Sequence, residues 1–332
     1  MSQLVSVIIP VYNTAPYLDA CLSSVLGQSL REIEVICVDD KSTDDSLFII
    51  RKYQAMDSRL KIIALPVNQG VSVARNRGLE EAVGDYVYFM DSDDFIDHFY
   101  LESMYEHAVD NNQDVVINTN WIIMDEAHSK EVPAANPGFD KKDPFFCSPF
   151  KVQAFFPRLV WTRLYRRRFL LDNEIKFPIL KGKESGEDEF FVSLAEILHC
   201  KSYLFPGPWY YYRAYREGSY TYQKITFGHI ESYYSLYKEL IRRNIPIDSI
   251  KLFYAGHLRL DSAEKFSLFQ SFMKEIEPHV NNNPKLYVPF DIYCMRAVLS
   301  SDSYESFIQK YNPDLSLSFV RDRLKKRSDR IG

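Results

Sequence analysis

Five short apolar stretches, each separated from the next by a segment with helical periodicity, constrain the first 120 residues more than any other feature. Between the stretches, apolar side chains recur at helical spacing, as in Leu18, Cys21, Leu22 and Val25. This alternation predicts an α/β fold with a mainly parallel sheet and helices on both faces. The stretches have the length and composition of buried strands, and they are Leu4–Pro10, Ile33–Val38, Lys61–Leu65, Tyr86–Met90 and Asp114–Asn118.

Carboxylates follow two of these predicted strands directly. Asp39 and Asp40 follow the second strand, and Asp91, Asp93 and Asp94 follow the fourth. Because ligands of open α/β sheets bind outside the carboxyl ends of the strands, we expect both groups at the ligand-binding edge. The spacing of Asp91 and Asp93 suits a hard divalent cation that also takes diphosphate oxygens. The same four residues, Asp-Ser-Asp-Asp, are also an ordinary turn and helix-cap sequence.

Other features exclude several classes of site. The turn after the first predicted strand, Pro10-Val-Tyr-Asn-Thr-Ala-Pro16, lacks the glycines of a dinucleotide-binding loop, and no Gly-x-x-x-x-Gly-Lys occurs in the chain. The net charge of −5 argues against a nucleic-acid partner. The five cysteines are scattered and include no Cys-x-x-Cys pair, which argues against a zinc ribbon or a disulfide framework and favours a reducing compartment.

From residue 121 onward the pattern changes. Glu126–Pro149 is rich in Pro, Lys, Asp and small residues without periodicity, and it predicts a long surface loop. Trp161 and Leu164 then fall on one face of a predicted helix, and strands are expected near 203–205 and 209–213.

Acidic residues open the last predicted helix before the C-terminal region. Glu187 and Asp188 begin an amphipathic segment that continues to about Leu198. Acids at a helix start are common caps because they face the positive end of the helix dipole. This ordinary interpretation applies to both residues from the local sequence alone.

The C-terminal third predicts long helices near 227–243 and 249–276 and a shorter one near 301–310. These helices could pack on the preceding domain, form a homo-oligomer or contact a membrane. The stretch 321–330 is basic, which is ordinary for a solvated tail and also suits weak attachment to an anionic membrane face. No signal peptide precedes Val5 and no apolar run has the length of a membrane span, so we expect a cytoplasmic protein, with peripheral contact at the inner face of the cell membrane as a further option.

Several segments resemble, in order and spacing, the motifs of family 2 glycosyltransferases of the GT-A fold. The first four are Val5–Asn13, Val38-Asp-Asp-Lys-Ser-Thr-Asp44, Asn68–Gly78 and Asp91-Ser-Asp-Asp94, and the later ones, typical of bacterial members, are Trp161–Tyr165, Glu187-Asp188 and Tyr211–Arg213 with Gly218-Ser219. The resemblance covers about the first two-thirds of the chain. It implies an inverting transfer of a sugar from a nucleotide diphosphate, most often UDP, to a glycan or lipid-linked glycan of cell-surface polysaccharide synthesis.

The resemblance also implies roles for individual residues. Asp91 and Asp93 would bind Mn²⁺ or Mg²⁺, with Asp93 as the first choice for direct ligation, and Asp188 would be the general base. Asp40 would accept the ring N–H of uracil. The residues implied to contact the nucleotide or its diphosphate are Pro10, Tyr12, Asp39, Asp40, Asn68, Arg75, Asp91, Ser92, Arg213 and Ser219.

The resemblance divides the chain into a GT-A domain and a mainly helical region. Residues 1–120 would form a nucleotide-binding half and 121–225 an acceptor-side half, followed by 226–332 with the basic tail. Two other functions stay open: a nucleotidyltransferase that makes an activated sugar, and a non-catalytic sugar-nucleotide-binding protein. The first would need a glycine-rich, basic loop after the first strand, which Tyr12–Pro16 does not supply. Nothing favours the second, because acids occupy all the acidic motif positions.

Overall fold

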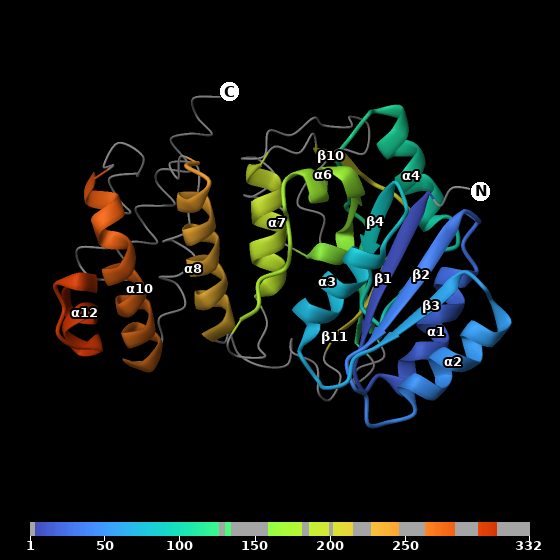
Figure 1. Cartoon of the computed structure of the whole chain (residues 1–332), viewed down its shortest axis with the longest axis horizontal. Coiled ribbons are helices and arrows are strands. Elements are labelled where there is room, and N and C mark those ends of the chain that lie inside the picture. The colour runs from blue at the N-terminus through green and yellow to red at the C-terminus, as the bar shows by residue number, and fades with distance from the viewer. Residues whose placement is uncertain are drawn as a thin grey trace. The chain divides into compact units, whose positions relative to one another are not determined.

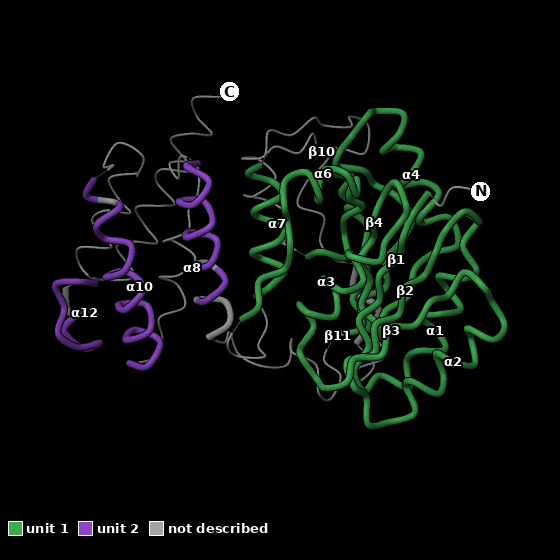
Figure 2. The backbone as a smooth tube through the Cα atoms, in the orientation of Figure 1, with its two compact units in different colours: residues 1–228 green, residues 229–332 purple. Residues whose placement is uncertain are grey.

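The chain forms two compact units, residues 1–228 and 229–332 (Figure 2). The computed structural model describes residues 4–125, 130–133, 159–180, 186–198, 202–214, 227–245, 263–282 and 298–310. Each unit is described by itself. The first contains both sheets and the predicted site.

Seven strands form the larger sheet of the first unit (Figure 1). β9 runs antiparallel to both of its neighbours, and all other pairs are parallel, which confirms the predicted α/β class with a mainly parallel sheet. Because β2 and β3 lie on one side of β1 and β4 on the other, the strand order reverses beside β1, where open α/β sheets bind ligands. Across the sheet the strands are β10 (Ser202–Phe205), β6 (Val115–Asn118), β9 (Arg163–Arg166), β4 (Tyr86–Phe89), β1 (Val5–Val11), β2 (Ile33–Asp39) and β3 (Leu60–Ala64).

Helices cover both faces of this sheet, as predicted (Figure 1). One layer contains α1 (Ala15–Leu26), α2 (Ser46–Met56) and α4 (Tyr100–Asp110), and the other contains α3 (Val71–Glu81), α6 (Arg167–Asp172) and α7 (Glu187–Ile197). Val7 and Ile9 of β1 belong to the core cluster with α1, α2 and α4, whereas Ile8 between them meets α3. Burial on both faces explains why these strands read as continuous apolar runs.

A smaller sheet contains four strands in the order β5 (Phe95–Ile96), β11 (Tyr210–Ala214), β7 (Trp121–Asp125) and β8 (Lys130–Pro133). β8 lies inside the segment that was predicted to be a long loop, and it pairs antiparallel with β7. The loop prediction is therefore wrong for these residues, because a pairing strand can recruit a segment that has no periodicity of its own. Residues 126–129 and 134–149 of the predicted loop lie outside the described residues.

The helix predicted around Trp161 and Leu164 is wrong. Val160–Thr162 forms one 3₁₀ turn (η1), and Arg163–Arg166 then forms β9 between β4 and β6. Leu164 joins the core cluster on one face of the sheet, while the ring of Tyr165 contacts Phe89 and Phe191 on the other. Burial on both faces of a short strand gives an apolar pattern that is easily confused with one face of a helix.

The described part of the second unit is helical, as predicted. Its helices are α8 (Phe227–Arg242), which begins at the end of the first unit, α10 (Ala263–Asn282) and α12 (Tyr304–Lys310). Tyr234 of α8 stacks on Phe272 of α10 with ring centroids 3.9 Å apart. The predicted helix from residue 249 is described only from 263, and the basic stretch 321–330 lies outside the described residues. Within the described ranges, no helix combines the length and the apolar character that crossing a membrane requires.

Gly78 allows α3 to lie directly against β1. A Cβ atom at this position would stand 2.4 Å from Cγ2 of Ile8, which is fully buried and stiff because it is β-branched. We expect Gly78→Ala to lower the free energy of unfolding by about 1–3 kcal/mol through overpacking. Urea unfolding measures this loss, and a double variant with Ile8→Ala should lose less than the sum of the two single variants. Additive losses would contradict a direct clash.

Candidate functional site

The predicted site residues of the first unit gather at the carboxyl ends of β1, β2 and β4. Thr14, which follows β1, donates a hydrogen bond from Oγ1 to Oγ of Ser92, which follows β4, over 3.0 Å. Pro10 is buried within β1, and Tyr12 just after it is 47% exposed. Asp39 at the end of β2 is buried and accepts the backbone N–H of Ser42, 3.3 Å from Oδ1. The loops that follow three neighbouring strands thus meet at one edge of the sheet.

Asp40 fixes the loop that leads into α3. Its two carboxylate oxygens accept the backbone N–H groups of Gln69 and Gly70, each over 2.7 Å, and its carbonyl accepts Nδ2 of Asn68 over 3.2 Å. Gly70 has a φ of 90°, a left-handed conformation that favours glycine. These bonds set where α3 begins, and therefore where Arg75 lies. The role of Asp40 in binding uracil stays a prediction.

The acids after β4 face two environments. Asp91 and Asp93 are partly exposed, whereas Asp94 is fully buried. Asp94 accepts hydrogen bonds from the hydroxyl of Tyr210 and, over 2.7 Å, from the backbone N–H of Arg213. Burial raises the pKa of Asp94, and the charges of Asp93 and Asp91 add to the rise. Asp94 therefore anchors β11 to the end of β4, and Asp91 and Asp93 are the two acids of this loop that solvent reaches.

Arg213 extends from β11 to the same loop. Its Nε donates to the backbone carbonyl of Asp93 over 2.8 Å, and its guanidinium lies 4.8 Å from the ring centroid of Tyr17. A cation thus lies beside the predicted metal-binding loop, and its contact with a diphosphate stays a prediction. Ser219, for which the same contact was predicted, lies outside the described residues.

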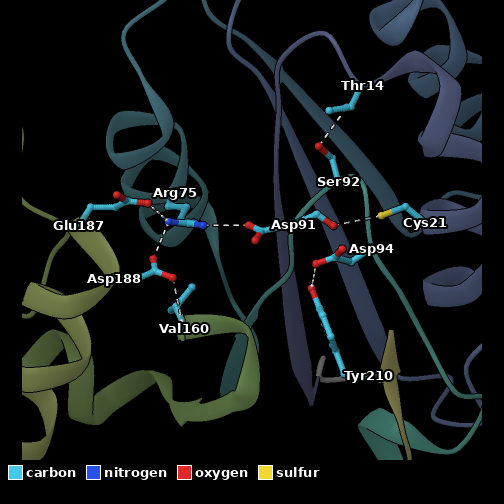
Figure 3. A network of polar contacts seen from close by, with 10 residues as sticks. All are labelled: Thr14, Cys21, Arg75, Asp91, Ser92, Asp94, Val160, Glu187, Asp188 and Tyr210. Atoms are coloured by element: carbon cyan, nitrogen blue, oxygen red, sulfur yellow. Dashed lines mark hydrogen bonds and ion pairs between the residues drawn. The ribbon is translucent and has the colours of Figure 1, made fainter. Parts of the chain in front are cut away.

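Arg75 joins three carboxylates at the centre of the site (Figure 3). Its Nη2 donates to Oδ1 of Asp91 over 2.8 Å. Its Nη1 donates to Oε1 of Glu187 and to Oδ1 of Asp188, each over 2.8 Å. The guanidinium of Arg75 therefore bridges the predicted base, Asp188, and a predicted metal ligand, Asp91. The elements that carry these three residues, α3, the β4 loop and α7, lie at separate places in the sequence.

Aromatic rings pack against the guanidinium of Arg75. The guanidinium carbon lies 5.2 Å from the ring centroid of Phe177, which stacks on Phe191 at 4.1 Å. Asn76 holds the main chain of Phe177 with two hydrogen bonds of 2.9 Å, one donated by Nδ2 and one accepted by Oδ1. Because these rings exclude water from one face of the guanidinium, the ion pairs of Arg75 with the three carboxylates are weakly screened.

Asp188 has an unusual proton affinity for an aspartate. Burial raises its pKa to about 7 against the opposing charge of Arg75, and the charges of Glu187 and Asp91 add to the rise. Its Oδ2 accepts the backbone N–H of Val160 over 3.2 Å. A carboxyl that titrates near neutral pH, placed beside a ligand-binding edge, is a candidate general base.

Glu187 is the site residue that the sequence interpretation missed. Its position at the start of α7 is fully explained by capping, so no local signal separates it from an ordinary helix start. The structure instead buries Glu187 to 8% exposure against Arg75. Its place in the Glu187-Asp188 motif, beside the predicted base, is the signal that could have marked it.

Asp91 and Asp93 offer oxygen ligands, which are the ligands that Mn²⁺ and Mg²⁺ prefer. In the part of the chain that the structure describes, no three His, Cys, Asp or Glu side chains gather as ligands of one ion. Two partly exposed carboxylates leave coordination positions for diphosphate oxygens and water, so the residues fit a divalent ion shared with a nucleotide. Metal binding stays a prediction.

Sequence comparisons relate this chain to known glycosyltransferases. The family model named Glycosyl transferase family 2 matches residues 6–169. The chain is 34% identical over 212 residues to the putative glycosyltransferase EpsH of Bacillus subtilis, covering 63% of this chain and 60% of EpsH. It is 30% identical over 213 residues to the poly(ribitol-phosphate) β-N-acetylglucosaminyltransferase TarP of Staphylococcus aureus, covering 63% of this chain and 62% of TarP. The chain thus spans less than two thirds of each relative.

A solved structure has the same fold. Residues 1–349 of TarS from S. aureus, crystallised in complex with UDP-GlcNAc, match with a TM-score of 0.62 and 25% sequence identity, covering 92% of this chain and 81% of that one. The family match begins in β1 and ends in α6, so it includes the loops after β1, β2 and β4 and also Arg75. On these grounds residues 6–169 belong to glycosyl transferase family 2, and the chain has a GT-A-like α/β fold.

Proposed function

We propose that this chain transfers a sugar from a UDP-sugar to a hydroxyl group of a cell-surface glycan or its lipid-linked precursor, with inversion at the anomeric carbon. The observation that carries the proposal is the contact of Arg75 with both Asp91 and Asp188. It puts a base candidate beside the loop predicted to hold the donor diphosphate. Relatives support the substrate class, because TarS was crystallised with UDP and with UDP-GlcNAc, and TarP and a Bacillus spizizenii relative are named for glycosyl transfer to poly(ribitol-phosphate).

Asp188 would remove the proton of the acceptor hydroxyl. Such a hydroxyl is too weak an acid to ionise at neutral pH, so a carboxylate within hydrogen-bond reach takes its proton as the new bond forms. The acceptor oxygen bonds to the anomeric carbon, the bond from that carbon to the UDP oxygen breaks, and UDP leaves with the bonding electrons. A single displacement of this kind needs one catalytic carboxylate and inverts the anomeric centre.

Asp91 and Asp93 would hold Mn²⁺ or Mg²⁺. When bound, the ion offsets the negative charge that grows on the departing UDP. Arg213, fixed to the carbonyl of Asp93, would contribute a second positive charge on the same side. Tyr12, with its exposed ring just after β1, would stack on the base.

Thermal unfolding with a panel of nucleotides tests the donor site. A ligand that binds only the folded state at about 100 times its Kd adds about 2.7 kcal/mol of stability. We expect UDP and one or more UDP-sugars to raise the Tm in the presence of Mn²⁺, and GDP and CDP to raise it less. We also expect Asp93→Asn to lose the part of the response that depends on Mn²⁺.

A matched variant controls for the change of charge. Asp110 lies exposed at the end of α4, so Asp110→Asn removes the same charge away from the site and should keep the full response. A folded wild-type chain that responds to none of the nucleotides would contradict the proposed function. A preference for GDP or CDP would contradict the UDP assignment alone.

A further inference from the structure

Glu187 and Asp188 share one nitrogen atom of Arg75. Oε1 of Glu187 and Oδ1 of Asp188 both accept from Nη1, each over 2.8 Å, while Nη2 serves Asp91 (Figure 3). The side chain of Glu187 is 10% exposed and that of Asp188 is 19% exposed. Two neighbouring carboxylates thus depend on the same N–H group in a site with little water.

The second oxygen of Glu187 has no compensating contact in the described part of the chain. Oε2 is buried and accepts no hydrogen bond there. A buried anionic oxygen without a donor is costly, and most such atoms in folded proteins have a partner. The negative charge of Glu187 is therefore balanced mainly through Nη1 of Arg75, the atom that also binds Asp188.

The charges that face Asp188 come from α3, from the loop after β4 and from its own helix α7. Arg75 on α3 is the cation, Asp91 after β4 is a second anion on that cation, and Glu187 is the adjacent residue of α7. The backbone N–H of Val160 in η1 is a further polar contact of Asp188. Three carboxylates thus surround one guanidinium, so a proton on any one of them relieves the repulsion among the others.

We propose that Glu187 is a positioning residue for the transfer reaction: by sharing Nη1 of Arg75 with Asp188, its negative charge makes Asp188 a stronger base than Arg75 alone would leave it. This inference rests on the proposed function, because it assigns a role relative to the base of that reaction. Glu187 acts through Arg75 and Asp188 and needs no contact with either substrate.

The environment of Asp188 supports this role. Burial raises the pKa of Asp188 to about 7, the charge of Glu187 adds to the rise, and Arg75 opposes it. Without the charge of Glu187, only burial and the charge of Asp91 would oppose the attraction of Arg75, and the pKa of Asp188 would fall. Because a general base works best when its pKa lies near the working pH, Glu187 tunes the catalytic group.

The test compares the pH dependence of kcat/KM in wild type and Glu187→Gln. The amide keeps an oxygen that can accept from Arg75 but removes the charge. We expect the acidic limb of the profile to move down by about one pH unit, as is typical when a like charge is removed from a carboxylate pair. At pH 6 the fraction of the plateau rate should then rise about five-fold, from about a tenth to about a half. Glu187→Asp keeps the charge and should restore the wild-type limb.

A control variant tests whether any lost charge has this effect. Glu80 lies at the exposed end of α3 and pairs with Arg77 and Lys176, so Glu80→Gln should leave the limb unchanged. A limb that stays in place in Glu187→Gln, while wild type transfers sugar, would overturn the inference and leave the proposed function intact. Failure of wild type itself to transfer sugar would overturn the proposed function instead.

A direct titration keeps the inference testable if Glu187→Gln does not fold. The ¹³C signal of the Asp188 carboxyl in the wild-type chain reports its protonation without any substrate. Burial beside the charge of Glu187 predicts that Asp188 titrates near neutral pH. A single step in the ordinary range of aspartate would overturn the inference.

Discussion

Replacing Arg75 with methionine should lower the free energy of unfolding by about 3–5 kcal/mol at pH 8, the range seen when one partner of a buried ion pair is removed. Arg75 is 3% exposed and binds Asp91, Glu187 and Asp188, so the substitution strands three negative charges in a site with little water. The loss should shrink as the pH falls towards 5, because Asp188, whose pKa is about 7, is then protonated and no longer needs a cation. Urea unfolding at both pH values measures the effect.

Arg77 provides the matched control. It lies on the same helix, is about half exposed, and pairs only with Glu80 among the ion pairs of the described residues. An exposed pair of this kind contributes little, so Arg77→Met should change the free energy of unfolding by less than about 1 kcal/mol at either pH. A loss of similar size in the two variants, or an Arg75→Met loss that does not depend on pH, would contradict the central role of Arg75.

Asp188→Asn should change stability in the opposite direction. The pKa of Asp188 rises from an ordinary value of 3.8 to about 7 in the folded chain, chiefly through burial. Between these two values the folded state binds more protons than the unfolded state, so wild-type stability falls as the pH rises. A neutral amide does not titrate and avoids this loss. We therefore expect the variant to exceed wild type by about 2–4 kcal/mol at pH 8.

The pH dependence separates this effect from a general gain in packing. Well below pH 4 the wild-type carboxyl is protonated in both the folded and the unfolded state, so the two stabilities should approach each other as the pH falls towards 4. Urea unfolding at pH 4, 6 and 8 measures the difference. Equal stabilities at pH 8 would contradict the buried, charge-crowded environment of Asp188. Such a gain is expected where a protein gives up stability to keep a reactive group in place.

Most of the fold of the first unit follows from local patterns. The strands from β1 to β4 and β6, and the helices between them, have apolar periodicity that depends little on distant residues. β8 and β9 do not, because β8 depends on pairing with β7, and β9 depends on pairing with the distant strands β4 and β6 and on burial on two faces. The prediction of a helix at Trp161 was wrong, and the strand Lys130–Pro133 was missed, because strand pairing decides both segments.

The candidate site divides in the same way. Acids at strand ends could be predicted, because the fold class brings those ends to one edge. The contacts of Arg75 could not, because they join α3, the β4 loop and α7 through tertiary packing. Glu187 was missed because helix capping already explained its position. Asp94 is buried against Tyr210, whereas Asp91 and Asp93 are partly exposed, and the local sequence does not reveal this difference.

The rate of UDP release at pH 8 tests the proposed reaction most directly. Wild type and Asp188→Asn are compared at equal occupancy by the UDP-sugar that binds, with a hydroxyl-bearing polymer as acceptor. The variant is expected to be at least as stable as wild type, so lost activity cannot be attributed to unfolding. A general base contributes about 10²–10⁴-fold, so we expect turnover by wild type and a loss of that size in the variant with unchanged donor affinity. Equal rates of UDP release by the two proteins would contradict the proposed reaction.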